Sequence, residues 1–304
     1  MIHGVVLGGL GNQLFKIFAT IAYSMEYNQP FFFLNKRASD EKRVTYWENF
    51  LINLKKYTIN EFNNLNFIPI GSWEHHYQKL PYANSNENYS IQGYLQSYKY
   101  FGKYENNIYD LIGWKEQREI VKSKYADYLL ISDEENNKLI NISIHFRIGD
   151  YKHLQNYHNI LPLKYYEMAI NKILYKLSET PLTFSKKIRF LYFYEKEDED
   201  IVNNIIENLK TSDVLTINDS TNTFQHYEKE FIPIDTNIPD WEQMLLMSAC
   251  HSNIIANSTF SWWGAYSNPN KNKIVCYPFI WFGYMLSHNN LNDMFPESWV
   301  KINF

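Results

Sequence analysis

The chain has 304 residues, of which 45% are apolar and 20% are charged, and its formal net charge is −4. This length allows one large domain or two of ordinary size. The composition is that of a folded globular protein and excludes a mainly disordered chain. The negative charge argues against nucleic acid as a partner, since no general positive field attracts it. An anionic ligand would have to be held by local donors and a few well-placed cations.

The cysteines and the N-terminus narrow the class of protein further. Cys250 and Cys276 are isolated and neither has a CxxC partner, which disfavours a zinc site and a disulfide scaffold. Met1–Gly4 leads directly into a short apolar strand, with no basic segment and no apolar stretch of about 20 residues. We therefore expect a cytoplasmic protein without a membrane span and with at most a peripheral association with a membrane surface.

Strands and helices are predicted to alternate along the chain. The first unit is a strand at 2–7, a glycine turn at 8–11 and a helix at 12–26, in which apolar residues recur at helical spacing. The other predicted elements, in chain order, are strands at 31–34 and 89–93, a charged helical stretch at 115–139, a strand at 141–146, a helix at 163–177, a strand at 188–194, a helix at 241–251, and strands at 253–256 and 273–277. This alternation is typical of α/β proteins with mostly parallel sheets.

Two polar runs help to place the domains. The run 132–137 is interpreted as the approach to a second domain, so we predict two α/β domains, 1–138 and 139–304, with a cleft between them. The acidic run 195–200 is interpreted as the solvated start of a helix, where carboxylates suit the positive end of the helix dipole.

The glycine turn is the first candidate for ligand binding. Glycines let the backbone approach a ligand closely, and amides at a helix start attract an anion such as a pyrophosphate. The segment 8–13 lacks the third glycine of a nicotinamide fingerprint, because Leu14 stands at that position. A tight strand–helix turn without any ligand is the alternative interpretation.

The second candidate is the segment His145–Tyr151, which follows a predicted strand. The guanidinium of Arg147 offers paired donors that match a phosphate without a metal. His145 could hydrogen-bond a base, and Asp150 could cap a helix or handle a proton. A structural ion pair between Arg147 and Asp150 is the alternative.

The third candidate is the segment Asn257–Tyr266. Its hydroxyl and amide groups lie between a predicted strand and a helix, which is a natural seat for an anion. Trp262 and Trp263 are interpreted mainly as core residues, and a contact with a sugar ring is the alternative.

These three segments, in this order, resemble the α-1,2-fucosyltransferases of glycosyltransferase family 11. Gly8–Phe15 matches the opening motif of that family, and His145–Tyr151 is similar to its His-x-Arg-Arg-Gly-Asp-Tyr signature. Asn257–Tyr266 follows its Asn-Ser-Ser/Thr-Phe-Ser-Trp-Trp-Gly-Ala motif. The segment Gln92–Phe101 is a fourth match, so the resemblance covers nearly the whole chain.

The resemblance implies two Rossmann-like domains of the GT-B-like class, the first on the acceptor side and the second binding the donor. It implies GDP-fucose as donor, a glycan as acceptor, inversion at the fucose carbon, and neither a cofactor nor an essential metal. The resemblance implies that Arg147 stabilises the departing GDP; our own hypothesis for the base is Asp150, with a structural cap as the alternative. The implied donor-binding residues are His145 and Arg147, Asn257, Ser258 and Thr259, Gly11, Asn12 and Gln13 on the opposite side, and Gln243 and Glu242.

The sequence departs from the family pattern at three places. Ile148 replaces the second arginine of the signature, and His251 is displaced by one from the usual histidine, at Ser252. Gln243 stands where an aspartate would read the guanine, and Glu242 would substitute only if the helix shifted. Transfer of another GDP-6-deoxyhexose, and a non-catalytic sugar-binding homologue, therefore stay open as alternatives.

The acceptor side is the part of the sequence that is hardest to interpret. The family resemblance suggests the 2-hydroxyl of a terminal galactose as the position attacked. Four residues could line the acceptor side, although surface or core positions are the simpler interpretation of each: Trp73, His75, His76 and Tyr94.

Overall fold

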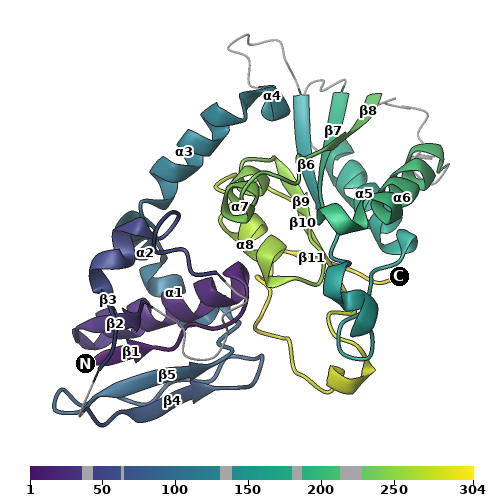
Figure 1. The fold of residues 1–304 in the computed structure, drawn as a ribbon. Coiled ribbons are helices and arrows are strands. Elements are labelled where there is room, and N and C mark those ends of the chain that lie inside the picture. The colour runs from purple at the N-terminus through teal and green to yellow at the C-terminus, as the bar shows by residue number, and fades with distance from the viewer. Residues whose placement is uncertain (36–43, 63–64, 131–138, 180–186, 213–227) are drawn as a thin grey trace. The chain divides into compact units, whose positions relative to one another are not determined.

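The computed structural model describes residues 1–304 except 36–43, 63–64, 131–138, 180–186 and 213–227. The chain forms two compact units, Met1–Gln117 with Asn289–Glu297, and Arg118–His288 with Ser298–Phe304. Each unit is built on a parallel sheet, which confirms the predicted α/β class with two Rossmann-like domains (Figure 1). The predicted cleft, and the assignment of acceptor and donor sides to the two domains, stay predictions.

The division between the units falls at 117/118, earlier than the predicted boundary at 138/139. The reason lies in side-chain contacts of the helical stretch before β6. Arg118 donates to the carbonyl of Ser267 at 3.1 Å, and Lys124 pairs with Glu242 at 2.8 Å. These contacts join 118–129 to the second unit, and the polar run 132–137 lies outside the described residues.

The N-terminal unit is a five-stranded sheet in the order β3-β2-β1-β5-β4, with all neighbouring strands parallel. Its strands are β1 (Ile2–Gly4), β2 (Phe31–Leu34), β3 (Thr58–Ile59), β4 (Ile68–Ser72) and β5 (Tyr89–Gly93). Its helices are α1 (Leu10–Tyr27) and α2 (Glu105–Ile112), with short 3-10 helices at Ile52–Tyr57, Tyr98–Tyr100 and Gly102–Tyr104. Helix α1 is buried on most of its surface because it packs on the sheet and also against α2.

The C-terminal unit is a six-stranded parallel sheet in the order β11-β10-β9-β6-β7-β8. Its strands are β6 (Leu139–His145), β7 (Lys187–Phe193), β8 (Glu228–Pro233), β9 (Ser252–Ile254), β10 (Val275–Pro278) and β11 (Val300–Ile302). Successive strands are added outward on one side from β6 to β8, and on the other side from β9 to β11. The order therefore reverses between β6 and β9, and such a switch point is where open α/β sheets bind ligands.

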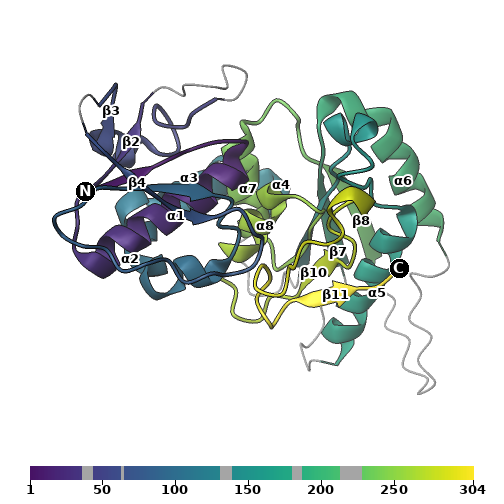
Figure 2. The ribbon, with the colours of Figure 1, turned by 90° about the horizontal axis from the view of Figure 1, so that it is seen from below.

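Helices cover both faces of this second sheet. The helices of this unit are α4 (Ala126–Leu129), α5 (Leu163–Ser178), α6 (Glu199–Thr211), α7 (Asp240–Ser248) and α8 (Thr259–Tyr266). The helix α3 (Trp114–Lys124) includes residues of both units. Figure 1 shows α5 and α6 on one face of the sheet and α7 and α8 on the other. Figure 2 shows α5 beside β10 and β11, with which it packs. The core between the sheet and α5 and α6 is built of aliphatic and tyrosine side chains.

Several sequence interpretations can be compared with these elements. The strands predicted at 31–34 and 89–93 coincide with β2 and β5, whereas the first strand ends at Gly4 and α1 already begins at Leu10. The short or partly exposed strands β3, β4, β8 and β11 lack a clear sequence pattern. Trp262 and Trp263 are fully buried, so their interpretation as core is confirmed. Among the described residues, no helix combines the length and the apolar character that crossing a membrane requires.

Candidate functional site

Two of the predicted segments meet at the switch point of the C-terminal sheet. Ile144 of β6 pairs with Ile254 of β9, and Arg147 and Asn257 each follow three residues after that pair. The hydroxyl of Tyr151 donates to the carbonyl of Asn257 at 3.1 Å and ties the two loops together. The structure therefore brings Arg147, Asp150 and Asn257 to the carboxyl ends of two neighbouring strands of one sheet.

Three neighbouring side chains contact the guanidinium of Arg147. One terminal nitrogen donates to Glu195, the other donates to Asp150, and the guanidinium lies 5.0 Å from the centre of the Tyr151 ring. The Arg147 side chain is 19% exposed, against 46% for each carboxylate partner. The ion pair with Asp150 that the sequence left as an alternative is present, and Glu195 is a second partner that the sequence analysis missed.

Arg147 keeps its positive charge at physiological pH. Burial lowers the pKa of Arg147, but the charges of Glu195 and Asp150 outweigh burial and raise its pKa overall. Burial is also the largest effect on Glu195 and raises the pKa of that carboxyl, with Arg147 opposing the shift and Asp198 adding to it. The pair thus joins a permanent cation to a carboxylate that is easier to protonate than usual.

The loop after β7 corrects the interpretation of the acidic run 195–200. Only Glu199 and Asp200 lie in the first turn of α6, as predicted for a helix start. Asp198 is buried, accepts from the amide of Gly149 at 2.7 Å and pairs with Lys152 at 2.6 Å. Asp198 is therefore bound to the loop after β6 instead of being solvated, whereas the other residues of the run are exposed as predicted.

Glu195, Glu197 and Asp198 place one ligand oxygen each within 4.8 Å of one another. This is a spacing that could hold a cation. Arg147 and Lys152 already balance two of these carboxylates, so the cluster does not require a metal to be stable. The expectation that no metal is essential stays a prediction.

His145 ends β6 beneath this site. It is buried, with its ring 5.4 Å from that of Phe260 in α8, and its Nδ1 atom has no hydrogen-bond partner among the described residues. Burial, and secondarily the charge of Arg147, lowers the pKa of His145 to about 3. The imidazole is therefore neutral at physiological pH, and it can offer a neutral donor or acceptor but no positive charge.

The segment after β9 forms the start of α8. Ser258 is the N-cap residue, and its Oγ accepts from the amide of Phe260 at 3.3 Å. The side-chain amide of Asn257 donates to Asn159 at 2.9 Å and to Trp281 at 3.1 Å, while its Oδ1 atom is buried with no partner among the described residues. Thr259 is the first residue of the helix. The amino end of α8 is thus placed at the switch point, where its dipole favours an anion.

The two predicted residues of α7 have other partners. Gln243 donates to the carbonyl of Ile238 at 2.8 Å, and so closes the turn before the helix. Glu242 is buried and accepts from Lys124 at 2.8 and 2.9 Å and from the hydroxyl of Tyr125. These contacts do not connect either residue to Arg147, and their roles in donor binding stay predictions.

Gly11, Asn12 and Gln13 lie in the first turn of α1 in the N-terminal unit. The side-chain amide of Gln13 donates to the carbonyls of Gly8 and Val44 at 3.1 and 3.0 Å, which makes it a brace of the glycine turn. Asn12 accepts from Gln96 at 3.0 Å, and Gln96 follows β5, the neighbour of β1. The structure therefore confirms a tight strand–helix turn here, and contact with the donor stays a prediction.

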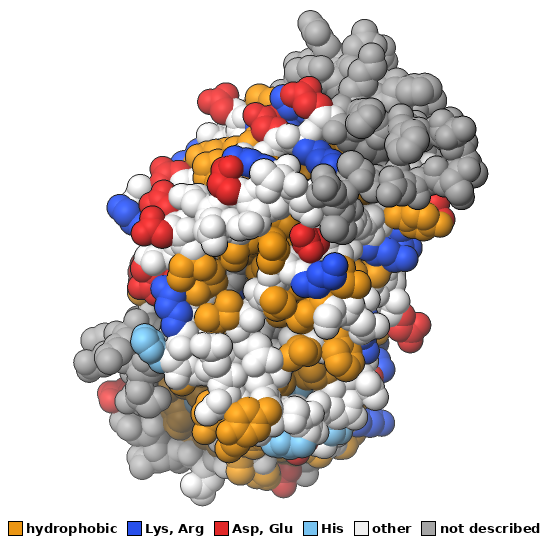
Figure 3. Space-filling model, turned by 90° about the vertical axis from the view of Figure 1, so that its right-hand side faces the viewer, with side chains coloured by type: hydrophobic (Ala, Val, Ile, Leu, Met, Phe, Trp, Pro, Cys, Tyr) orange, Lys and Arg blue, Asp and Glu red, His pale blue; other side chains and the backbone are white. Residues whose placement is uncertain are grey.

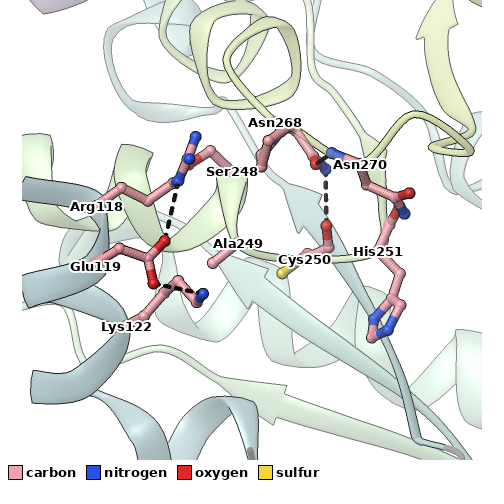
Figure 4. A pocket seen from close by; sticks show the side chains of 10 residues that line it. Arg118, Glu119, Lys122, Ser248, Ala249, Cys250, His251, Asn268 and Asn270 are labelled. Carbon is pink, nitrogen blue, oxygen red and sulfur yellow. Dashed lines mark hydrogen bonds and ion pairs between the residues drawn. The ribbon is translucent and has the colours of Figure 1, made fainter. Parts of the chain in front are cut away.

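A separate pocket of about 370 Å³ opens at the other end of the C-terminal sheet. Residues 248–251, which line it, precede β9, whereas Arg147 and Asn257 follow the ends of their strands. Figure 4 shows Glu119 bridging Arg118 and Lys122 on one side of the pocket, and Asn268 bonded to Cys250 on the other. Since these polar groups already have protein partners, the pocket is a weaker candidate for anion binding than the switch point.

The distribution of charge on the surface is consistent with an anion that is bound by a few local groups. On the face drawn in Figure 3, acidic and basic side chains are interspersed among polar and apolar ones. With a net charge of −4, an anion at this site would depend on Arg147 and the start of α8.

Comparisons with known proteins agree with the motifs. Residues 215–303 match the model of the family described as Glycosyl transferase family 11. The O-antigen biosynthesis glycosyltransferase WbnK of Escherichia coli is 26% identical over 341 aligned residues, covering 99% of this chain and all of that protein. An α-1,2-colitosyltransferase of Escherichia coli is 23% identical, covering 97% of this chain and 96% of that protein.

Among solved structures, an Arabidopsis thaliana FUT1 mutant in complex with GDP is similar over 91% of this chain and 70% of that one, with a TM-score of 0.47 and 11% identity. The family match includes the motif Asn257–Tyr266, which supplies the start of α8 at the switch point. The relatives extend the similarity over nearly the full length, through the segment that carries Arg147. The resemblance predicted from the sequence motifs is thereby confirmed, and the chain is similar to glycosyl transferase family 11.

Proposed function

We propose that the chain is an inverting fucosyltransferase that moves L-fucose from GDP-fucose to the 2-hydroxyl of a terminal galactose on a glycan. The observation that carries this proposal is the position of Arg147 beside the start of α8, at the switch point of a Rossmann-like sheet. A planar cation and a helix N-terminus are together suited to a diphosphate. The full-length similarity to two glycosyltransferases supports the same reading.

The donor diphosphate binds at Arg147 and the amino end of α8. Because Glu195 and Asp150 already engage Arg147, the diphosphate replaces at least one carboxylate. His145 and Asn257 each carry a buried polar atom with no partner among the described residues. Buried polar atoms without partners are unfavourable, so these two atoms are candidates for hydrogen bonds to the nucleotide.

The chemical step is a displacement at the anomeric carbon of fucose. The acceptor oxygen forms a bond to this carbon on one face while the bond to the β-phosphate oxygen breaks on the other. The electron pair of that bond leaves with GDP, and Arg147 stabilises the developing charge. The proton of the acceptor hydroxyl passes to a base, for which Asp150, the carboxylate of the motif His145–Tyr151, is the first candidate.

A colitose donor is the second candidate. One relative is named as an α-1,2-colitosyltransferase, and Gln243 stands in this chain where the family resemblance leads us to expect an aspartate. Both observations concern the donor, and neither changes the type of reaction.

The test is product formation from GDP-fucose and from GDP-colitose, each with galactose-terminated acceptors, in the presence and absence of EDTA. We expect GDP release that depends on the acceptor, resists EDTA and is faster with GDP-fucose. Faster transfer of colitose would exchange the first candidate for the second. Loss of activity in EDTA would contradict metal-free catalysis, and no binding of either donor would refute the proposal as a whole.

A further inference from the structure

Two large aromatic side chains are exposed next to each other in the N-terminal unit. Trp73 is 58% exposed and Tyr94 is 40% exposed, and their rings lie edge to face with centroids 5.4 Å apart. Apolar surface of this size is unfavourable in water, and exposed apolar patches mark sites of binding. The pair is therefore a candidate for contact with a ligand.

The backbone places these two rings together by a specific arrangement. The last paired residues of β4 and β5 are Ser72 and Gly93, so Trp73 and Tyr94 follow directly, side by side, at the carboxyl ends of their strands. Gly93 has φ +97, and a Cβ atom there would lie 1.9 Å from the carbonyl oxygen of Ser72. Leu95 is fully buried at φ 54, a conformation that is unfavourable for leucine. Tyr94 is thus held outward between a required glycine and a strained leucine.

Both rings contact buried side chains that hold them in place. The ring of His75 stacks on Tyr94, with centroids 4.7 Å apart and planes at 21°. The ammonium of Lys16 lies 5.7 Å from the centre of the Trp73 ring and donates to the carbonyl of Gly93. Lys16 is itself buried. Supported rings lose little freedom when a ligand binds, which favours a preformed binding surface.

The chemistry of the surroundings favours a neutral sugar over a nucleotide. An aromatic face suits the side of a pyranose ring that carries C–H groups, and side-chain amides suit its hydroxyls. Two residues beyond Tyr94, Gln96 is buried and its amide already donates to Asn12, so the exposed rings are the groups that would contact the sugar. A nucleotide would need a cation for its phosphates, and Lys16 is buried and committed to Gly93. The observations therefore fit a pyranose.

We propose that Trp73 and Tyr94 form a stacking platform for the terminal pyranose of the acceptor glycan, an assignment that rests on the proposed glycosyl transfer. His75 acts as a positioning residue for Tyr94. The pair would then decide which terminal sugars are accepted, because stacking requires a pyranose with an exposed C–H face.

The test compares Trp73→Ala and Tyr94→Ala with the control Tyr82→Ala. Tyr82 is a 79% exposed aromatic residue of the same unit that packs against Tyr27. Binding of lactose and of methyl β-galactoside to the full chain is measured by calorimetry and saturation-transfer NMR without donor. We expect each platform variant to weaken galactoside binding about fivefold or more, Trp73→Phe to recover most of it, and Tyr82→Ala to bind like the unchanged protein. GDP binding should stay within about twofold in all variants.

Unchanged galactoside affinity in Trp73→Ala, or a loss of GDP affinity in that variant, overturns the platform. Acceptor kinetics separate this inference from the proposed function. If the chain transfers fucose and the acceptor KM is the same in Trp73→Ala, the platform fails while the function stands. If galactoside binding depends on Trp73 but no GDP-sugar is turned over, the platform stands and the donor assignment fails.

Discussion

Arg147 and Glu195 form an ion pair across the ends of two neighbouring strands. The register of β6 and β7 pairs His145 with Phe193, and Arg147 and Glu195 each follow two residues later. Side chains two residues apart in a strand point to the same face. The contact is therefore a continuation of the strand pairing, and it fixes the guanidinium at the switch point before any ligand arrives.

Glu195→Gln should tighten the binding of GDP. The amide can still accept from Arg147, but the negative charge beside the incoming diphosphate is gone. We expect the Kd of GDP to fall by about threefold or more, in line with the modest energy of a partly exposed ion pair. Calorimetry at low and high salt measures this, with Glu195→Asp as the variant that retains the charge. Weaker binding of GDP to Glu195→Gln would show that Glu195 supports the bound state instead.

Gly149→Ala should destabilise the C-terminal unit. Gly149 has φ +27, and a Cβ atom there would lie 2.4 Å from a carboxylate oxygen of Glu195. We expect a loss of about 1–3 kcal/mol in the free energy of unfolding, measured by denaturant titration. Gly102→Ala is the matched control, because no atom lies within 4 Å of its added Cβ. If both variants lose the same stability, the contact with Glu195 is not the cause.

The sequence predicts this site only in part, and Glu195 shows why. Arg147, Asp150 and Asn257 are recognisable because each follows an apolar strand within a motif. Glu195 lies in a run of acidic residues that is equally typical of a solvated helix start, and its partner depends on the register of β6 and β7. Local pattern carries no information on that register. For the same reason, the sequence does not predict the buried position of Asp198, where its carboxylate accepts from the amide of Gly149.

In the N-terminal unit, too, some features are predictable from the sequence and others depend on strand pairing. The helix after the glycine turn is evident from its apolar spacing, whereas β4 has an exposed first half and no alternating pattern. The pairing of β4 with β5 is what brings Trp73 beside Tyr94. From the sequence alone, each of these residues could line the acceptor side, but a surface or core position was the simpler interpretation.

His145 should make stability depend on acidity. Its pKa is lowered to about 3 in the folded protein, chiefly by burial, against about 6.5 in the unfolded chain. As the pH falls from about 6.5 towards 3, the unfolded state binds a proton that the folded state does not bind. The free energy of unfolding therefore decreases by at most about 1.4 kcal/mol per pH unit. Melting curves from pH 7 to 4 measure this slope.

His145→Gln is the comparison for that slope. It should flatten the acid side of the profile without abolishing it, because burial also lowers the pKa of His3, to about 4. An unchanged slope in His145→Gln would show that the buried imidazole is not the titrating group.

Glu242→Gln should affect stability more than ligand binding. Glu242 accepts from Lys124 and Tyr125 at a buried position, and loss of the charge weakens these bonds by about 1–3 kcal/mol. We expect a lower melting temperature and a Kd for GDP within about twofold of the unchanged protein. A selective loss of GDP affinity at unchanged stability would restore the interpretation of Glu242 as a donor contact.

In the proposed reaction, Arg147 stabilises GDP as it leaves the donor sugar. The most direct measurement is the kcat/KM for GDP-fucose of Arg147→Ala, with a galactose-terminated acceptor in EDTA, after circular dichroism has shown that the variant is folded. We expect a loss on the order of 10²-fold or more, larger in kcat than in KM, with the activity of Arg147→Lys between those of Arg147→Ala and the unchanged protein. A folded Arg147→Ala variant that keeps its activity would show that Arg147 does not stabilise the leaving group.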